Sequence, residues 1–108
     1  QKSTYIEVKS VTLLERDDGL GCFPDAVTAR GLKHLQRLLA LHHEGHRAVL
    51  LFCVPHEGIQ RVQAADHIDP VYAKALSAVA SQGVEVLAYS VKFETSGMTL
   101  LNEIPVAY

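Results

Sequence analysis

Ala48-Val-Leu-Leu-Phe-Cys-Val54 is a run of apolar residues that contains no charge and no turn former. A continuous run of this kind is typical of a central strand in a parallel sheet, which is covered on both faces. The segment before it has the pattern of a helix that starts near Asp25 or Thr28 and ends at Glu44, with Gly45 just past the end. The run therefore predicts the centre of a sheet, reached through a crossover helix.

A second helix is predicted after the apolar run. Asp69 is its expected N-cap, Pro70 is its first residue, and it is expected to run to Gln82 and to close at Gly83. The other expected elements are a strand at 5–13, a charged loop at 15–21, a long loop at 55–68, a strand at 84–93, a hairpin turn at 96–97, a short strand around 98–101 and an edge or irregular tail marked by Pro105. This order predicts the α/β class, with a mixed central sheet and crossover helices.

Length and composition limit the class of protein. A chain of 108 residues with 48% hydrophobic residues is expected to form a single domain, residues 1–108, with its own core. The net charge of −2 excludes a polybasic nucleic-acid binder, so any such binding must come from a local patch. Cys22 and Cys53 form no CxxC motif and indicate reduced thiols in a cytoplasmic protein. No segment has the roughly 18 apolar residues of a membrane span, so we expect no membrane contact.

Glu7-Val8-Lys9, inside the first predicted strand, is the main candidate for chemistry. Alternate residues of a strand face the same side, so Glu7 and Lys9 are expected to emerge together, about 6.6 Å apart along the strand. Ile6 and Val8 are expected on the opposite side. A carboxylate can hold a hard cation, and an ammonium can orient water or stabilise charge on phosphate. The pattern fits phosphodiester chemistry, but it also fits an ordinary charge pair on a half-exposed sheet.

The first predicted helix has a basic face. Its apolar stripe is formed by Leu32, Leu35, Leu38 and Leu39. The opposite face carries Arg30, Lys33, His34 and Arg37. Charges of mostly one sign on an acidic chain favour contacts with a phosphate backbone, although a solvated outer face would have the same residues.

Several further residues are weaker candidates. Ser10 and Thr12 could donate hydrogen bonds to a phosphate near Glu7 and Lys9. Asp25 fits a helix N-cap or a turn better than a functional ligand. The histidines at 42, 43 and 46 do not have the spacing of a zinc-binding HExxH motif, so zinc is not expected.

Seven blocks of the sequence, in order and over nearly the whole chain, share one family pattern. They are Tyr5-Ile-Glu-Val-Lys-Ser-Val-Thr-Leu13, Phe23-Pro-Asp-Ala-Val-Thr28, Arg30-Gly31, Lys33-His-Leu35, Gly45-His-Arg-Ala-Val49, Ile68-Asp-Pro70 and Gly83-Val-Glu-Val-Leu-Ala-Tyr89. These blocks resemble the C-terminal half of the sugar fermentation stimulation (SfsA) family. The resemblance implies a cytoplasmic bacterial DNA-binding protein that regulates sugar use. It also implies a restriction-endonuclease-like core, similar to the PD-(D/E)xK nuclease fold, preceded by an OB-like domain.

The resemblance assigns catalytic roles to Glu7 and Lys9. Glu7 would ligate Mg²⁺ together with the carbonyl of Val8 and an aspartate from the preceding strand, and Lys9 would position water or a phosphate oxygen. That aspartate is expected upstream of this chain, because Pro24-Asp25 follows the Glu-x-Lys instead of preceding it. We therefore expect a C-terminal fragment that lacks the OB-like domain and the N-terminal part of the fold, binds Mg²⁺ weakly and is inactive by itself.

Three functions remain open from the sequence. The first is a DNA-binding protein that contacts the DNA backbone and regulates sugar metabolism genes. The second is a Mg²⁺-dependent nuclease or phosphodiesterase that uses Glu7 and Lys9. The third is a structural half-domain that packs against a partner, the missing N-terminal domain.

Overall fold

The apolar run forms β4 (Arg47–Val54), an inner strand of a four-stranded sheet with the order β1-β4-β6-β7. The structure, a computed structural model, describes residues 2–16 and 18–108. β4 pairs in parallel with β1 (Thr4–Ser10) and with β6 (Glu85–Glu94), and β7 (Gly97–Ile104) pairs antiparallel with β6. The α/β class, the mixed sheet and the inner position of residues 48–54 are confirmed.

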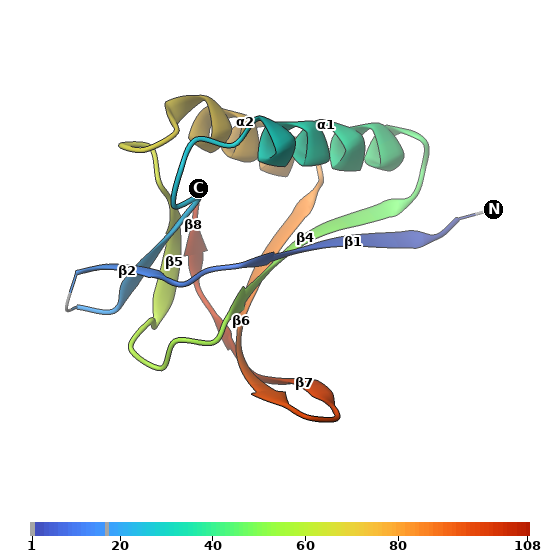
Figure 1. Ribbon diagram of the computed structural model, residues 1–108. Coiled ribbons are helices and arrows are strands. Elements are labelled where there is room, and N and C mark those ends of the chain that lie inside the picture. The colour runs from blue at the N-terminus through green and yellow to red at the C-terminus, as the bar shows by residue number, and fades with distance from the viewer. Residues whose placement is uncertain (1, 17) are drawn as a thin grey trace.

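Both helices, α1 (Ala29–His43) and α2 (Pro70–Ser81), lie over the same face of this sheet (Figure 1). The core between helices and sheet includes Leu35, Leu38, Leu50, Phe52, Tyr72, Leu76 and Ala88. No helix in the described part of the chain covers the opposite face, where Leu51 is only half-buried although Val49 and Cys53 are buried. The expected cover on both faces is therefore seen in part, with helices on one face of β4 only, and the continuous apolar run reflects the inner position of this strand.

The chain also forms a second four-stranded sheet, with the order β2-β3-β5-β8. Its strands are β2 (Leu13–Arg16), β3 (Leu20–Phe23), β5 (Arg61–Ala64) and β8 (Val106–Ala107). The sequence did not predict this second sheet. The loops predicted at 15–21 and 55–68 are wrong, because they contain residues of β2, β3 and β5, although Asp17 lies outside the described residues. The strand predicted at 5–13 is two strands, because the chain leaves β1 at Val11 and Thr12 before β2 begins.

The helix ends follow the sequence closely. Thr28 caps α1, because its Oγ1 accepts a hydrogen bond from the Gly31 N–H at 2.8 Å. Asp69 caps α2 through Tyr72 N–H at 3.0 Å, and its second oxygen accepts from Thr28 N–H at 3.0 Å, so one carboxylate joins the starts of both helices. The predicted start at Thr28 and the cap at Asp69 are confirmed, whereas Asp25 caps neither helix. No helix among the described residues is long and apolar enough to cross a membrane.

Candidate functional site

β1 is an edge strand, and it presents Glu7 and Lys9 on the side covered by α1. The side chains of Glu7 and Lys9 are 34% and 17% exposed. The residues on the opposite side are more open, with Ile6 at 56% and Val8 at 49%. The predicted shared side of Glu7 and Lys9 is therefore confirmed. They lie under a helix yet reach solvent, since nothing among the described residues pairs with the outer edge of β1.

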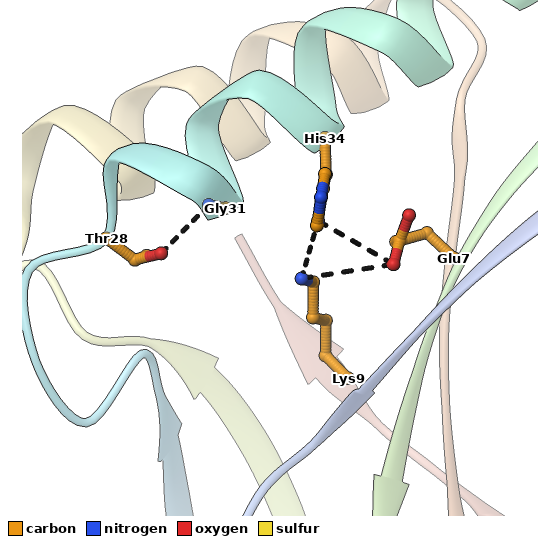
Figure 2. A network of polar contacts seen from close by, with 5 residues as sticks. All are labelled: Glu7, Lys9, Thr28, Gly31 and His34. Carbon is orange, nitrogen blue, oxygen red and sulfur yellow. Dashed lines mark hydrogen bonds and ion pairs between the residues drawn. The ribbon is translucent and has the colours of Figure 1, made fainter.

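His34 of α1 completes a three-residue cluster with Glu7 and Lys9, which Figure 2 shows between the helix and the strand. Lys9 Nζ lies 2.7 Å from His34 Nδ1. Glu7 Oε2 lies 3.9 Å from Lys9 Nζ and 3.6 Å from His34 Nδ1. An ammonium carries only donors, so Lys9 donates this hydrogen bond and Nδ1 accepts it. In a neutral ring the proton then sits on Nε2, which leaves His34 with an N–H that can donate to a ligand.

The sequence placed His34 on the outer face of the helix, with the solvated cations. The structure places it beside the sheet instead, at the boundary between the polar face and the apolar stripe. A sequence signal for this position exists. Leu38 and Leu41 follow His34 by four and seven residues, so the three side chains lie on one side of the helix. The link to Glu7 and Lys9 depends on which strand lies beneath, and that does not appear in the helix pattern.

The three other predicted cations lie along the exposed side of α1. Arg30, Lys33 and Arg37 are all exposed. They span about 10 Å of helix, since each residue adds about 1.5 Å. Arg37 also borders the space between α1 and β1, together with Glu7 and His34. We call Arg30, Lys33 and Arg37 the α1 cation stripe. Arg37 places one end of this stripe beside the Glu7–Lys9–His34 cluster.

The remaining candidates are not brought into this cluster. Ser10 is exposed and follows the alternation of Ile6 and Val8, so its side chain lies on the opposite side of β1. Thr12 is exposed beyond the end of β1. Asp25 is exposed in the segment between β3 and α1. Val8 would act through its backbone carbonyl, because its side chain lies on the open face of the sheet.

The cluster provides one carboxylate as a ligand for a hard cation. Among the described residues, no group of three or more His, Cys, Asp or Glu side chains is arranged to hold a metal ion. Mg²⁺ is commonly held by one or two carboxylates together with phosphate oxygens of the substrate. The donor set of Glu7 therefore fits a cation that arrives with a phosphate better than a resident cation.

Comparison with known proteins gives consistent matches. Residues 1–97 match the family model described as the Sugar fermentation stimulation protein RE domain. A sugar fermentation stimulation protein homolog from Shewanella piezotolerans is 56% identical over 106 residues, which is 98% of this chain and 44% of the relative. A homolog of the same name from Marinomonas sp. is 54% identical over 105 residues, covering 97% of this chain and 40% of the relative.

A solved structure, Pyrococcus furiosus SfsA in complex with Ca²⁺, matches with a TM-score of 0.82 and 28% identity, over 95% of this chain and 44% of that one. The chain thus spans less than half the length of these relatives. Family model, relatives and structure all agree. The chain belongs to the sugar fermentation stimulation protein family, within the region described as its RE domain.

Proposed function

We propose that this chain is a DNA-binding module that contacts the phosphate backbone and serves the control of sugar metabolism genes. The observation that carries the proposal is the α1 cation stripe, which leads to the Glu7–Lys9–His34 cluster on β1. Binding of Lys and Arg to phosphates releases condensed counterions, which supplies most of the affinity for the DNA backbone. The link to sugar metabolism rests on the name that the relatives share.

The scaffold we propose is a PD-(D/E)xK-like core. Glu7-Val8-Lys9 on the edge strand of a mixed sheet, under a helix that carries cations, supports this assignment. In this arrangement Glu7 and the Val8 carbonyl would hold a hard cation such as Mg²⁺, which would draw a phosphate oxygen to the site. The Ca²⁺ bound by the P. furiosus relative supports a cation of this class. Lys9 and the Nε2–H of His34 would donate hydrogen bonds to the same phosphate.

The test is DNA affinity as a function of salt, measured by fluorescence anisotropy. We expect Lys33→Ala with Arg37→Ala to weaken binding and to reduce the slope of log K against log salt by about 0.9 for each lost phosphate contact. Lys74→Ala is the control for the loss of one surface charge, because Lys74 is an exposed lysine on α2 and does not belong to the stripe. An unchanged affinity and slope in the double variant would show that the stripe is only a solvated helix face.

A second candidate function is a Mg²⁺-dependent nuclease. It is favoured by one observation, the placement of a carboxylate and an ammonium on the same side of β1. Incubation of labelled DNA with Mg²⁺ in the binding experiment above distinguishes the two functions. Cleavage that is lost in Lys9→Ala would support the nuclease, and binding without cleavage would support the DNA-binding module. Absence of both would leave a structural half-domain that packs against a partner.

A further inference from the structure

A recess of about 160 Å³ lies between β1 and α1, immediately beside the Glu7–Lys9–His34 cluster. Its lining includes Tyr5, Glu7, His34, Arg37, Leu38 and Leu41. The volume is several times the roughly 30 Å³ that one water occupies in the liquid. We expect such a space to admit a single pyrimidine ring.

The lining divides into an apolar part and a polar part. Leu38, at 3% exposure, and the half-buried Leu41 form an apolar wall from α1. Tyr5, at 37% exposure, adds an aromatic ring from β1. Arg37 supplies hydrogen-bond donors, and the Glu7 oxygen that does not hold the cation supplies an acceptor. A bare phosphate suits this lining poorly because of the leucines and the carboxylate. A nucleobase, with two apolar π faces and an edge of donors and acceptors, matches both parts.

The aromatic wall is held in place before any ligand binds. The ring of Tyr5 contacts the ring of His46 edge-on, with centroids 5.1 Å apart and an angle of 75° between the planes. His46 Nδ1 accepts a hydrogen bond from Ser3 N–H at 3.0 Å, which fixes the imidazole. A ring that is already oriented loses little conformational entropy when a base contacts it.

We propose that this recess binds the base of one unpaired nucleotide of a DNA strand whose phosphates lie on the α1 cation stripe. The proposal rests on the DNA-binding function proposed above. Arg37 belongs to the stripe and also lines the recess, so the recess can hold a base while the stripe holds the phosphate of the same nucleotide. In an intact duplex the bases are paired and stacked, and one must leave the stack to enter such a pocket. The protein is therefore expected to prefer single-stranded or locally unpaired DNA.

The first measurement compares three DNA probes of equal length by fluorescence anisotropy with the full chain. They are a single-stranded oligonucleotide, the same strand with abasic sites in place of nucleotides, and a perfect duplex. The abasic strand keeps every phosphate and loses only the bases. We expect the intact strand to bind about fivefold or more tightly than the abasic one, since stacking of a base on an aromatic side chain contributes about 1–3 kcal/mol. Equal affinities for the two would overturn the proposal.

Two substitutions in the recess sharpen this measurement. Tyr5→Leu removes the aromatic ring and keeps an apolar side chain, and Leu41→Trp fills the space. Each is expected to lower the affinity for the intact strand to that for the abasic strand, and to leave the abasic affinity unchanged. Arg30→Ala is the control, because Arg30 belongs to the stripe but not to the recess. It is expected to weaken both strands by the same factor. Retention of base discrimination in both recess variants would contradict the assignment.

Free nucleoside monophosphate separates a strand site from a nucleotide site. It carries the same base and phosphate but no neighbouring phosphates, so we expect it to compete only at a far higher concentration than the oligonucleotide. Competition at equal molar concentration would overturn the assignment to a strand. Failure of the function proposed above looks different, because no DNA probe would then bind. Salt-dependent binding without base discrimination would overturn only the present inference.

Discussion

The two faces of the β1-β4-β6-β7 sheet differ in the side chains that they carry and in what covers them. The helix-covered face holds the buried Leu50 and Phe52, yet its edge strand contributes Glu7 and Lys9 to it. The open face receives the apolar side chains Ile6 and Val8 of the same strand. On β1 the charged residues Glu7 and Lys9 point towards the helices, together with Tyr5, and the aliphatic residues Ile6 and Val8 point away. For these charged and aliphatic residues the usual alternation of a half-covered sheet is reversed.

This reversal separates what β1 does for the fold from what it does for the site. If burial alone set the direction of β1, Ile6 and Val8 would lie under α1, because a shift by one residue exchanges the two faces. The register Glu7↔Leu50 and Lys9↔Phe52 keeps the polar pair under the helix instead. Stability should therefore depend on the inner strand β4, and ligand binding should depend on the edge strand β1.

The largest expected effect comes from a pair of size-matched truncations on the two faces. Leu50→Ala removes a side chain that is 0% exposed under the helices, and we expect a loss of about 2–5 kcal/mol in the free energy of unfolding. Ile6→Ala removes a similar volume from the open face, where the side chain is 56% exposed, and we expect a loss below about 1 kcal/mol. Urea unfolding followed by circular dichroism measures both values. Similar losses at both positions would mean that the open face is also packed in solution.

The sequence predicted the sheet that these two residues belong to, but not the second one. The pattern in residues 48–54 and the caps at Thr28 and Asp69 are local signals, and they placed β4 and both helices correctly. Strands β3 and β5 have four residues each, too few to show a period. They pair with one another across about 40 residues of intervening chain, and each also pairs with a further short strand, β2 or β8. No local pattern encodes the partnership of β3 with β5.

The sequence likewise predicted the part of the candidate site that lies on one strand, but not the part contributed by the helix. Glu7 and Lys9 were found because strand alternation is local, whereas the role of His34 depends on contact between β1 and α1. Residues that share one element can be grouped from sequence. Residues that meet across two elements need the packing, and the 2.7 Å contact between Lys9 and His34 is of that kind.

A smaller effect on stability is expected from low pH, through Asp69, which joins the starts of the two helices. Hydrogen bonds from the N–H groups of Thr28 and Tyr72 lower the pKa of Asp69 below its ordinary value. A carboxyl group with a lowered pKa stabilises the fold above its unfolded pKa of about 3.9, and this contribution is lost as the pH falls through the lower folded value. We expect the urea midpoint to fall as the pH is lowered from 5 towards 3, by less than the shift caused by Leu50→Ala.

Asp69→Asn tests this assignment. The amide keeps one acceptor oxygen where the carboxylate has two, so the variant should be less stable at pH 7 and should lose part of the acid dependence. Asp66→Asn is the control, because the side chain of Asp66 is 74% exposed. If both variants keep the full acid dependence, another carboxyl group is responsible.

The smallest effects on stability are expected from two polar pairs, Arg47–Glu85 on the open face and Glu7–Lys9 on the helix-covered face. The two pairs should differ in their effect on DNA binding. Glu85 binds Arg47 through two hydrogen bonds of 2.6 and 2.8 Å at the amino ends of β6 and β4, and both side chains are exposed. Exposed ion pairs contribute little, so Glu85→Gln should leave the urea midpoint unchanged within error. Lys9→Met, under the helix, removes the hydrogen bond from Lys9 to His34, so we expect a loss of about 0.5–1.5 kcal/mol.

DNA affinity then separates the two pairs. Lys9→Met removes an ammonium from the cluster, so binding should weaken and the salt slope should fall by about 0.9 if Lys9 contacts a phosphate. Glu85→Gln removes a negative charge that is already neutralised by Arg47, and it lies outside the cluster, so affinity should stay the same. Anisotropy titrations of both variants at two salt concentrations give the comparison. Equal weakening by the two substitutions would mean that net charge, and not the position of Lys9 under α1, determines binding.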